Sequence, residues 1–105
     1  LITDYSGIYA DYLLVNRPII FANFDHEAYL SVRDLGWNYD EITPGPKAGN
    51  WEQLLFHLET IIVHKKDDYK EDRLKLKNQI YKFQDSNSCN RVIKEINSLD
   101  SNLLR

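Results

Sequence analysis

Residues 1–24 read LITDYSGIYADYLLVNRPIIFANF, and this stretch decides the fold class. Residues 1–3 predict the end of a strand, and residues 4–7 predict a tight turn. A helix should follow, because apolar side chains recur there at helical spacing, at Ile8, Tyr9, Tyr12 and Leu13. Ser6 is expected to cap that helix, since its hydroxyl can accept a hydrogen bond from an amide two or three residues later.

The second half of the stretch predicts a return to the sheet. Asn16-Arg17-Pro18 should end the helix, because proline disfavours helical backbone at the residue before it. Residues 19–21 (IIF) then form a short apolar run, which is typical of a strand buried on both faces of a parallel sheet. Residues 1–24 therefore predict a strand, a helix and a second strand, which make one βαβ unit.

The rest of the chain predicts helices and loops. Residues 25–30 favour a short helix, and residues 31–50 favour irregular structure because glycine and proline recur there. Asn50 should cap a helix with one apolar stripe, made of Leu54, Leu55, Leu58, Ile61 and Ile62. A third helix is expected over residues 67–83, with an apolar face of Tyr69, Leu76, Ile80 and Phe83. After a polar break at 85–90, a last helix should carry Val92, Ile96, Leu99 and Leu103 on one side.

Length and composition narrow the class of protein. The 105 residues suit one domain, and 43% apolar residues are enough for a core. The two expected strands and four or five helices make the fold class α/β. A net charge of −3 argues against general nucleic-acid binding, and the single cysteine, Cys89, excludes an internal disulfide. No apolar run approaches the roughly 18 residues of a membrane span. Two parallel strands make a poor sheet alone, so we expect residues 1–105 to be part of a longer chain.

The turn after the first strand is the strongest candidate site. Ligands of open α/β sheets bind beyond the carboxyl ends of the strands, and amides at a helix start attract phosphate. Gly7 would let a phosphate approach the backbone closely, and Thr3 and Ser6 would add hydroxyl donors. Asp4 would repel phosphate, so it should order the turn or meet a hydroxyl or a cation. An ordinary capped turn explains the same residues from spacing alone.

The other polar groups give weaker indications of a functional site. Residues 44–46 (PGP) form a stiff loop that can line a pocket or simply lead into the next helix. The histidines lie too far apart in sequence for a zinc pattern, so we expect them to be solvated or packed; they are His26, His57 and His64. Cys89 lacks the spacing of a nucleophile and is expected to be buried or inert. Lysines between residues 65 and 82 alternate with acids, which favours a solvated helix face over a membrane surface.

An ordered set of segments carries a family resemblance. These are LITDYS (1–6), DYLL (11–14), NRPIIF (16–21), Tyr29, Arg33, Gly36, Tyr39, Asp40, PGP (44–46), WEQL (51–54), FQD (83–85) and Arg91-Val92. Together they resemble the CDP-glycerol glycerophosphotransferases, the teichoic-acid and capsule polymerases and primases of bacteria.

This resemblance implies a GT-B architecture, with two Rossmann-like domains and the active site between them. Residues 1–105 would be the C-terminal segment of the second domain, with the catalytic residues upstream. The family moves glycerol phosphate or ribitol phosphate from a CDP-alcohol donor to a lipid-linked polymer acceptor, with no cofactor. The implied location is cytoplasmic, peripheral at the inner membrane face, and the implied partners are donor, acceptor and the rest of the enzyme, without nucleic acid. The family's Thr-Asp-Tyr-Ser segment lies at the donor diphosphate, which corresponds to Thr3, Asp4 and Ser6, with Gly7 adjoining.

Two departures from the family pattern leave alternatives open. Gly7 stands where the family usually has a second serine, and residues 85–90 lack the glycine of the family's closing segment. These changes fit altered donor choice or an inactive copy. A non-catalytic α/β binding module, with the helices after residue 50 as its surface, and a GT-B nucleotide-sugar transferase also remain. Arg91 would approach the nucleotide or brace the last helix, and bracing is the favoured role.

Overall fold

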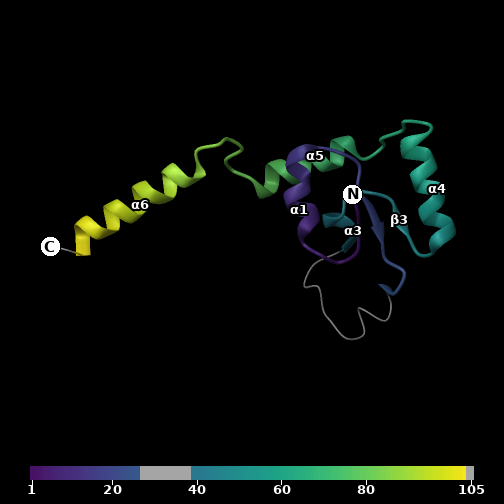
Figure 1. Ribbon diagram of the computed structural model, residues 1–105, viewed down its shortest axis with the longest axis horizontal. Coiled ribbons are helices and arrows are strands. Elements are labelled where there is room, and N and C mark those ends of the chain that lie inside the picture. The colour runs from purple at the N-terminus through teal and green to yellow at the C-terminus, as the bar shows by residue number, and fades with distance from the viewer. Residues whose placement is uncertain (27–38, 104–105) are drawn as a thin grey trace.

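A computed structural model describes residues 1–26 and 39–103, with side chains up to residue 99 (Figure 1). The strands are β1 (Ile2–Thr3), β2 (Ile20–Ala22) and β3 (Lys47–Ala48). The helices are α1 (Ile8–Tyr12), α3 (Tyr39–Ile42), α4 (Trp51–Ile62), α5 (Lys70–Ile80) and α6 (Ser88–Leu103), with a 3₁₀ turn, η1, at Leu13–Val15. The prediction of an α/β chain with short parallel strands followed by several helices is confirmed.

The three strands form one parallel sheet in the order β1-β2-β3. Ile2 lies opposite Ile20, and Phe21 lies opposite Lys47, so the predicted βαβ unit is confirmed and a third strand extends it. The expectation of irregular structure over residues 31–50 is wrong at α3 and β3. The two residues of β3 lie between a proline and a glycine and have no apolar run. They form a strand because the Phe21 and Asn23 amides donate to the Pro46 and Ala48 carbonyls. Most of the predicted helix at 25–30 lies outside the described residues.

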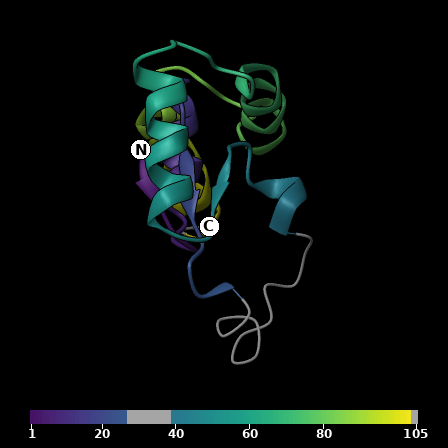
Figure 2. The same ribbon diagram turned by 90° about the vertical axis from the view of Figure 1, so that its right-hand side faces the viewer.

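Side chains of β2 are buried on both faces of the sheet, as the sequence predicts. Ile19 and Phe21 form one cluster with Leu13, against which Leu1, Tyr9, Tyr12 and Leu76 pack. Ile20 forms the other cluster with Ala48 and Leu54, against which Leu58 and Ile61 pack. Figure 2 shows α4 and α5 on opposite sides of the strands. The sheet therefore lies between two helical layers.

Helix α4 begins as predicted but buries a narrower stripe. The Gln53 amide donates to Asn50 Oδ1 at 2.9 Å, and the Gly49 amide donates to Gln53 Oε1 at 2.6 Å. This reciprocal arrangement satisfies backbone donors that have no partner inside the helix. Leu55 and Ile62 are 62% and 66% exposed, so only part of the predicted apolar stripe is buried. They lie beside the stripe that faces the sheet, on the outer side of the helix.

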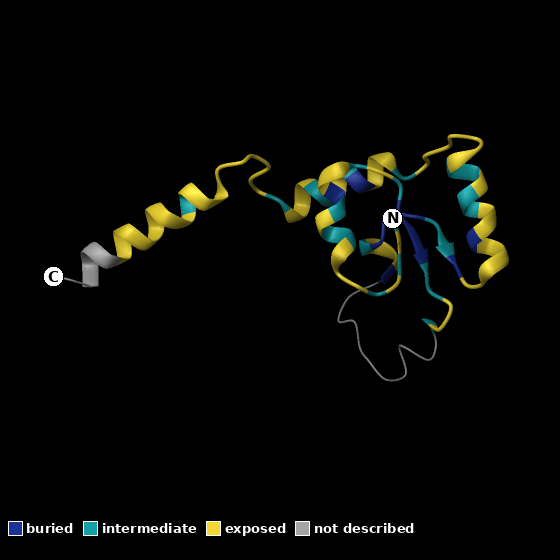
Figure 3. Cartoon of the chain, in the orientation of Figure 1, coloured by how far each residue is buried: buried dark blue, intermediate teal, exposed yellow. Residues whose placement is uncertain are grey.

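The last two helices differ from their predicted bounds. Helix α5 is shorter than the expected 67–83, and Leu76 packs on the core while Ile80 and Phe83 are about half exposed. Helix α6 begins at Ser88, inside the predicted polar break. Its apolar side chains Val92, Ile96 and Leu99 are exposed, and the helix extends away from the sheet (Figures 1 and 3).

Candidate functional site

The predicted ligand turn lies between β1 and α1, at the carboxyl end of β1. The Ser6 amide donates to Asp4 Oδ1 at 3.0 Å, so Asp4 orders the turn as expected. The N-cap residue of α1 is Gly7, and the prediction that Ser6 fills that position is wrong. The Ser6 hydroxyl still accepts from the Ile8 amide, over a long 3.4 Å. The turn is therefore organised by an aspartate and leaves the Ser6 side chain weakly engaged.

Gly7 has open space around it. A Cβ built on Gly7 meets nothing within 4 Å, and its φ of −71° is ordinary for any L-residue. Neither backbone conformation nor packing therefore requires glycine here. Asp4, Ser6 and Gly7 are all exposed, and Thr3 is half-buried at the strand end. The turn presents one hydroxyl and a backbone amide to the solvent.

Three aromatic side chains join the carboxyl ends of β1 and β2. The Tyr5 hydroxyl lies 3.3 Å from His26 Nδ1, and the two rings stack with centroids 5.9 Å apart. The Tyr39 ring packs against both, at 5.6 Å from Tyr5 and 5.0 Å from His26. We call these three residues the aromatic cluster. The sequence did not predict this cluster, although Tyr5 and Tyr39 both belong to the segments that carry the family resemblance.

Tyr39 is the buried member of the cluster. It is 9% exposed, and its hydroxyl has no hydrogen-bond partner among residues 1–26 and 39–103. Burial raises the pKa of Tyr39 well above its usual value, and the nearby Tyr5, Tyr9, Asp40 and Asp4 raise it further. The phenol is therefore protonated at neutral pH, and it has a hydrogen to donate.

The proline-glycine-proline loop packs closely on the sheet. A Cβ on Gly45 would lie 2.1 Å from the backbone oxygen of Ile19. The Lys47 ammonium donates to the carbonyls of Thr43 and Gly45, and it lies 4.9 Å from the centroid of the Phe21 ring. Burial lowers the pKa of Lys47. This cation is engaged in holding the loop, so it is a structural group.

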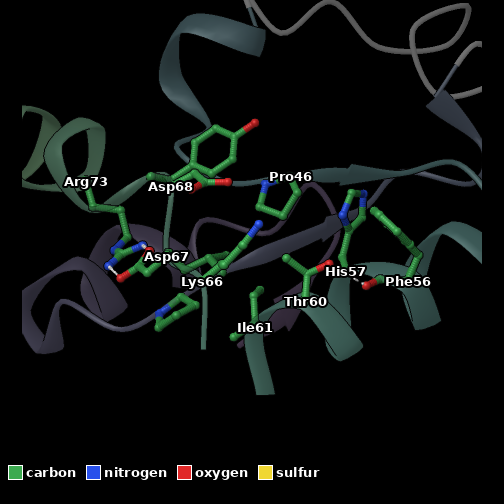
Figure 4. Close-up of a pocket in the computed structure, with 12 residues that line it drawn as sticks. Pro46, Phe56, His57, Thr60, Ile61, Lys66, Asp67, Asp68 and Arg73 are labelled. Atoms are coloured by element: carbon green, nitrogen blue, oxygen red, sulfur yellow. Dashed lines mark hydrogen bonds and ion pairs between the residues drawn. The ribbon is translucent and has the colours of Figure 1, made fainter. Parts of the chain in front are cut away.

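The same loop lines two cavities, which answers the question that its sequence left open. Pro46 lines a cavity of about 370 Å³ between α4 and the segment before α5 (Figure 4). Pro44 and Gly45 line a second, of about 840 Å³, between α3 and α5. The first lies near the amino ends of β2 and β3, since Pro18 and Pro46 border it. Neither cavity is lined by residues 3–7, so both are separate from the predicted ligand turn.

Arg73 borders the first cavity, and its role was missed in the sequence. It is 1% exposed, and its two terminal nitrogens donate to the Asp67 carboxylate at 2.6 and 2.5 Å. Nε donates to Asn16 Oδ1 at 3.2 Å, which joins α5 to the end of η1. The hydrogen bond from Arg73 lowers the pKa of Asp67. With three of its donors engaged by the chain, Arg73 stabilises the fold.

A sequence model described as CDP-glycerol:poly(glycerophosphate) glycerophosphotransferase matches residues 1–98. The chain belongs to this family. The family assignment expected from the ordered segments of the sequence is confirmed.

Several curated relatives are named as teichoic acid primases or polymerases. A teichoic acid glycerol-phosphate primase of Bacillus subtilis is 32% identical over 96% of this chain and 25% of its own length. A teichoic acid ribitol-phosphate primase of Bacillus spizizenii is 34% identical over 93% of this chain and 24% of its own length. A teichoic acid poly(ribitol-phosphate) polymerase of the same species is 40% identical over 52% of this chain and 9% of its own length. The chain thus spans a quarter or less of the relatives' length.

Within this family member, the remaining polar candidates have structural contacts. Arg91 donates to Asp85 at 3.0 Å and lies 4.0 Å from the Phe83 ring centroid, so it braces the start of α6 as favoured. His57 Nε2 lies 2.9 Å from the Lys47 carbonyl, and His64 faces Glu59 at 3.9 Å. In residues 1–26 and 39–103, no three histidine, cysteine or acidic side chains converge on a metal position.

Two further findings concern the C-terminal part of the chain. Cys89 is exposed in the first turn of α6. The expectation that it lies away from a helix start is therefore wrong, and of the two expected alternatives, buried or inert, burial is wrong. The error follows from placing the start of α6 after residue 90. None of the helices in the described part of the chain is long and apolar enough to cross a bilayer.

Proposed function

We propose that the protein containing this chain transfers glycerol phosphate or ribitol phosphate from a CDP-alditol donor to a lipid-linked polymer acceptor in teichoic acid synthesis. Family membership supports this, and the matched relatives are named as primases and polymerases for both alditol phosphates. In this proposal residues 1–105 are the C-terminal segment of the second domain of a GT-B enzyme. The enzyme works at the inner membrane face, and residues before this segment complete the active site.

The segment's contribution is the donor diphosphate site at Thr3, Asp4, Ser6 and Gly7. The observation that carries this assignment is the open space at Gly7. Its φ is ordinary and no atom lies near it, so the fold itself does not require glycine at this position. A residue without a side chain leaves the backbone amide accessible to a phosphate. The Ser6 hydroxyl, which holds only a long hydrogen bond, is available as a second donor. The Asp4 carboxylate accepts a hydrogen bond from the Ser6 amide and so fixes the conformation of the turn.

The turn would stabilise the diphosphate of the donor while CMP leaves. The acceptor oxygen attacks the β-phosphorus of the donor and forms a new phosphate ester. The bond between the β-phosphorus and the bridging oxygen breaks, and CMP leaves with the electron pair. The acceptor proton passes to a base in the preceding part of the enzyme. Hydrogen-bond donors fixed beside the diphosphate stabilise the charge that develops on it, which is the main contribution of protein groups to phosphoryl transfer.

A calorimetric titration of the full-length protein tests the proposal. CDP-glycerol and CDP-ribitol should bind, and UDP-glucose should not. Gly7→Ala should fold as well as the wild type, because the added methyl meets no atom within 4 Å, and it should keep the donor affinity, because the backbone amide remains. Ser6→Ala should weaken binding about tenfold, the usual loss for a hydrogen bond to a charged group. Ser86→Ala, in the exposed turn before α6, is the matched control and should bind normally.

The opposite results separate the alternatives. Unchanged donor affinity and turnover in Ser6→Ala would refute the diphosphate site. Binding of UDP-glucose in place of CDP-alditols would favour a nucleotide-sugar transferase. A full-length protein that binds no nucleotide would favour a non-catalytic binding module.

A further inference from the structure

The Tyr39 hydroxyl is a buried polar group on α3. Its oxygen finds no hydrogen-bond partner in the described chain, although the residue is only 9% exposed. Buried side-chain hydroxyls are nearly always hydrogen-bonded, because enclosing one without a partner costs free energy. Such a group therefore needs an explanation, and a missing ligand is one explanation that can be tested.

The surroundings of Tyr39 point to the ligand turn. Its ring packs against Tyr5, which lies within residues 3–7, with centroids 5.6 Å apart. Tyr39 also packs edge-on against Phe21 of β2, with centroids 6.3 Å apart. Asp4 is close enough to raise its pKa. Tyr39 thus lies beside the same turn whose Ser6 and Gly7 face the solvent.

The chemistry of the hydroxyl selects its partner. The phenol is protonated at neutral pH, and an acceptor of its hydrogen is what it lacks. The turn offers donors, namely the Ser6 hydroxyl and backbone amides, so a group that binds there must be rich in acceptors. A diphosphate supplies only acceptor oxygens at neutral pH. Tyr5 belongs to the turn itself, so the Tyr39 ring is in direct contact with the turn.

We propose that the Tyr39 hydroxyl donates a hydrogen bond to a diphosphate oxygen of the nucleotide held at residues 3–7. This inference rests on the proposed function and adds a binding residue from α3 to the donor site.

Tyr39→Phe in the full-length protein tests the inference, because it removes the hydroxyl and keeps the ring. The free protein should unfold at the same or a higher urea concentration, since the lost oxygen has no hydrogen-bond partner in residues 1–26 and 39–103. CDP and CDP-glycerol should each bind about tenfold more weakly, the usual loss for a hydrogen bond to a charged group. Binding of cytidine, which has no phosphate, should not change.

Tyr9→Phe is the matched control. Tyr9 also packs edge-on against Phe21, with centroids 5.2 Å apart, but it is only partly buried and lies on α1. Removal of the Tyr9 hydroxyl should leave the affinity for CDP, CDP-glycerol and cytidine unchanged. Equal binding of CDP by the wild type and Tyr39→Phe would overturn the inference while the proposed function stands. A wild type that binds neither CDP-alditol would overturn both.

Discussion

Gly45 is the position where the structure leaves the least room for a side chain. A methyl group there would lie 2.1 Å from the Ile19 oxygen, 3.0 Å from Phe21 Cε2 and 3.1 Å from the Ile19 carbonyl carbon. The nearest atom belongs to the backbone that leads into β2, so it cannot turn aside as a flexible side chain would. Gly45→Ala therefore requires the loop to separate from the sheet.

The size of the effect follows from that geometry. A carbon and an oxygen in contact are normally more than 3 Å apart, so the loop must shift by about 1 Å at the side of Phe21, which is completely buried. Overpacking of this kind costs about 1–3 kcal/mol, and backbone contact places Gly45→Ala near 3 kcal/mol. A protein of this size has a free energy of unfolding of only about 5–15 kcal/mol, so the variant should lose a substantial share.

Urea unfolding followed by circular dichroism at 222 nm measures the loss. Gly7→Ala is the control, because its methyl group meets no atom and its φ suits alanine. It should be neutral or more stable by about 0.4–1 kcal/mol, since alanine restricts the unfolded chain. Equal stabilities of Gly45→Ala and Gly7→Ala would refute the reasoning about the close approach.

Two further variants test single interactions. Arg73 lowers the Asp67 pKa below its ordinary 3.8, so the pair's contribution to stability is present above that pH and is lost as pH falls through the lower, folded value. Asp67→Asn should therefore be less stable than the wild type at pH 7, with a smaller difference at pH 3, and a pH-independent difference in urea unfolding would contradict this. Asn50→Ala removes the α4 cap and should cost about 1 kcal/mol by the same assay, whereas Asn90→Ala, at an exposed position inside α6, should cost little. Equal losses in these two asparagine variants would show that the cap contributes nothing.

Local signals in the sequence were sufficient for β2 and the start of α4. A run of three apolar residues after a proline predicts a strand buried on both faces, and Asn50 before a helical stripe predicts a cap. Strand β3 could not be predicted in this way, because its two residues have no pattern of their own. It is a strand only because Phe21 and Asn23 donate to Pro46 and Ala48, which are distant in sequence.

The candidate site was predictable in part for the same reason. The turn at residues 3–7 is contiguous, so its place at the end of β1 and the role of Asp4 in ordering it follow from the sequence. Tyr39 and His26 contact Tyr5 or each other only in the folded chain, and no spacing in the sequence predicts these contacts. The sequence did not predict the role of Arg73, because it lies among lysines and acids expected to be solvated. Its contact with Asn16, 57 residues away, forms only in the folded chain.

The link from Arg73 to Asn16 and Asp67 also bears on how parts of the chain open. Helix α5 and η1 share a buried guanidinium, so amide protons in these two segments should exchange with solvent in one cooperative event. Helix α6 has only exposed or half-buried side chains among its described residues, and its amides can exchange by fraying without disturbing the sheet. The boundary between slow and fast exchange would then fall after Tyr81, whose hydroxyl still donates to the Ala10 carbonyl of α1.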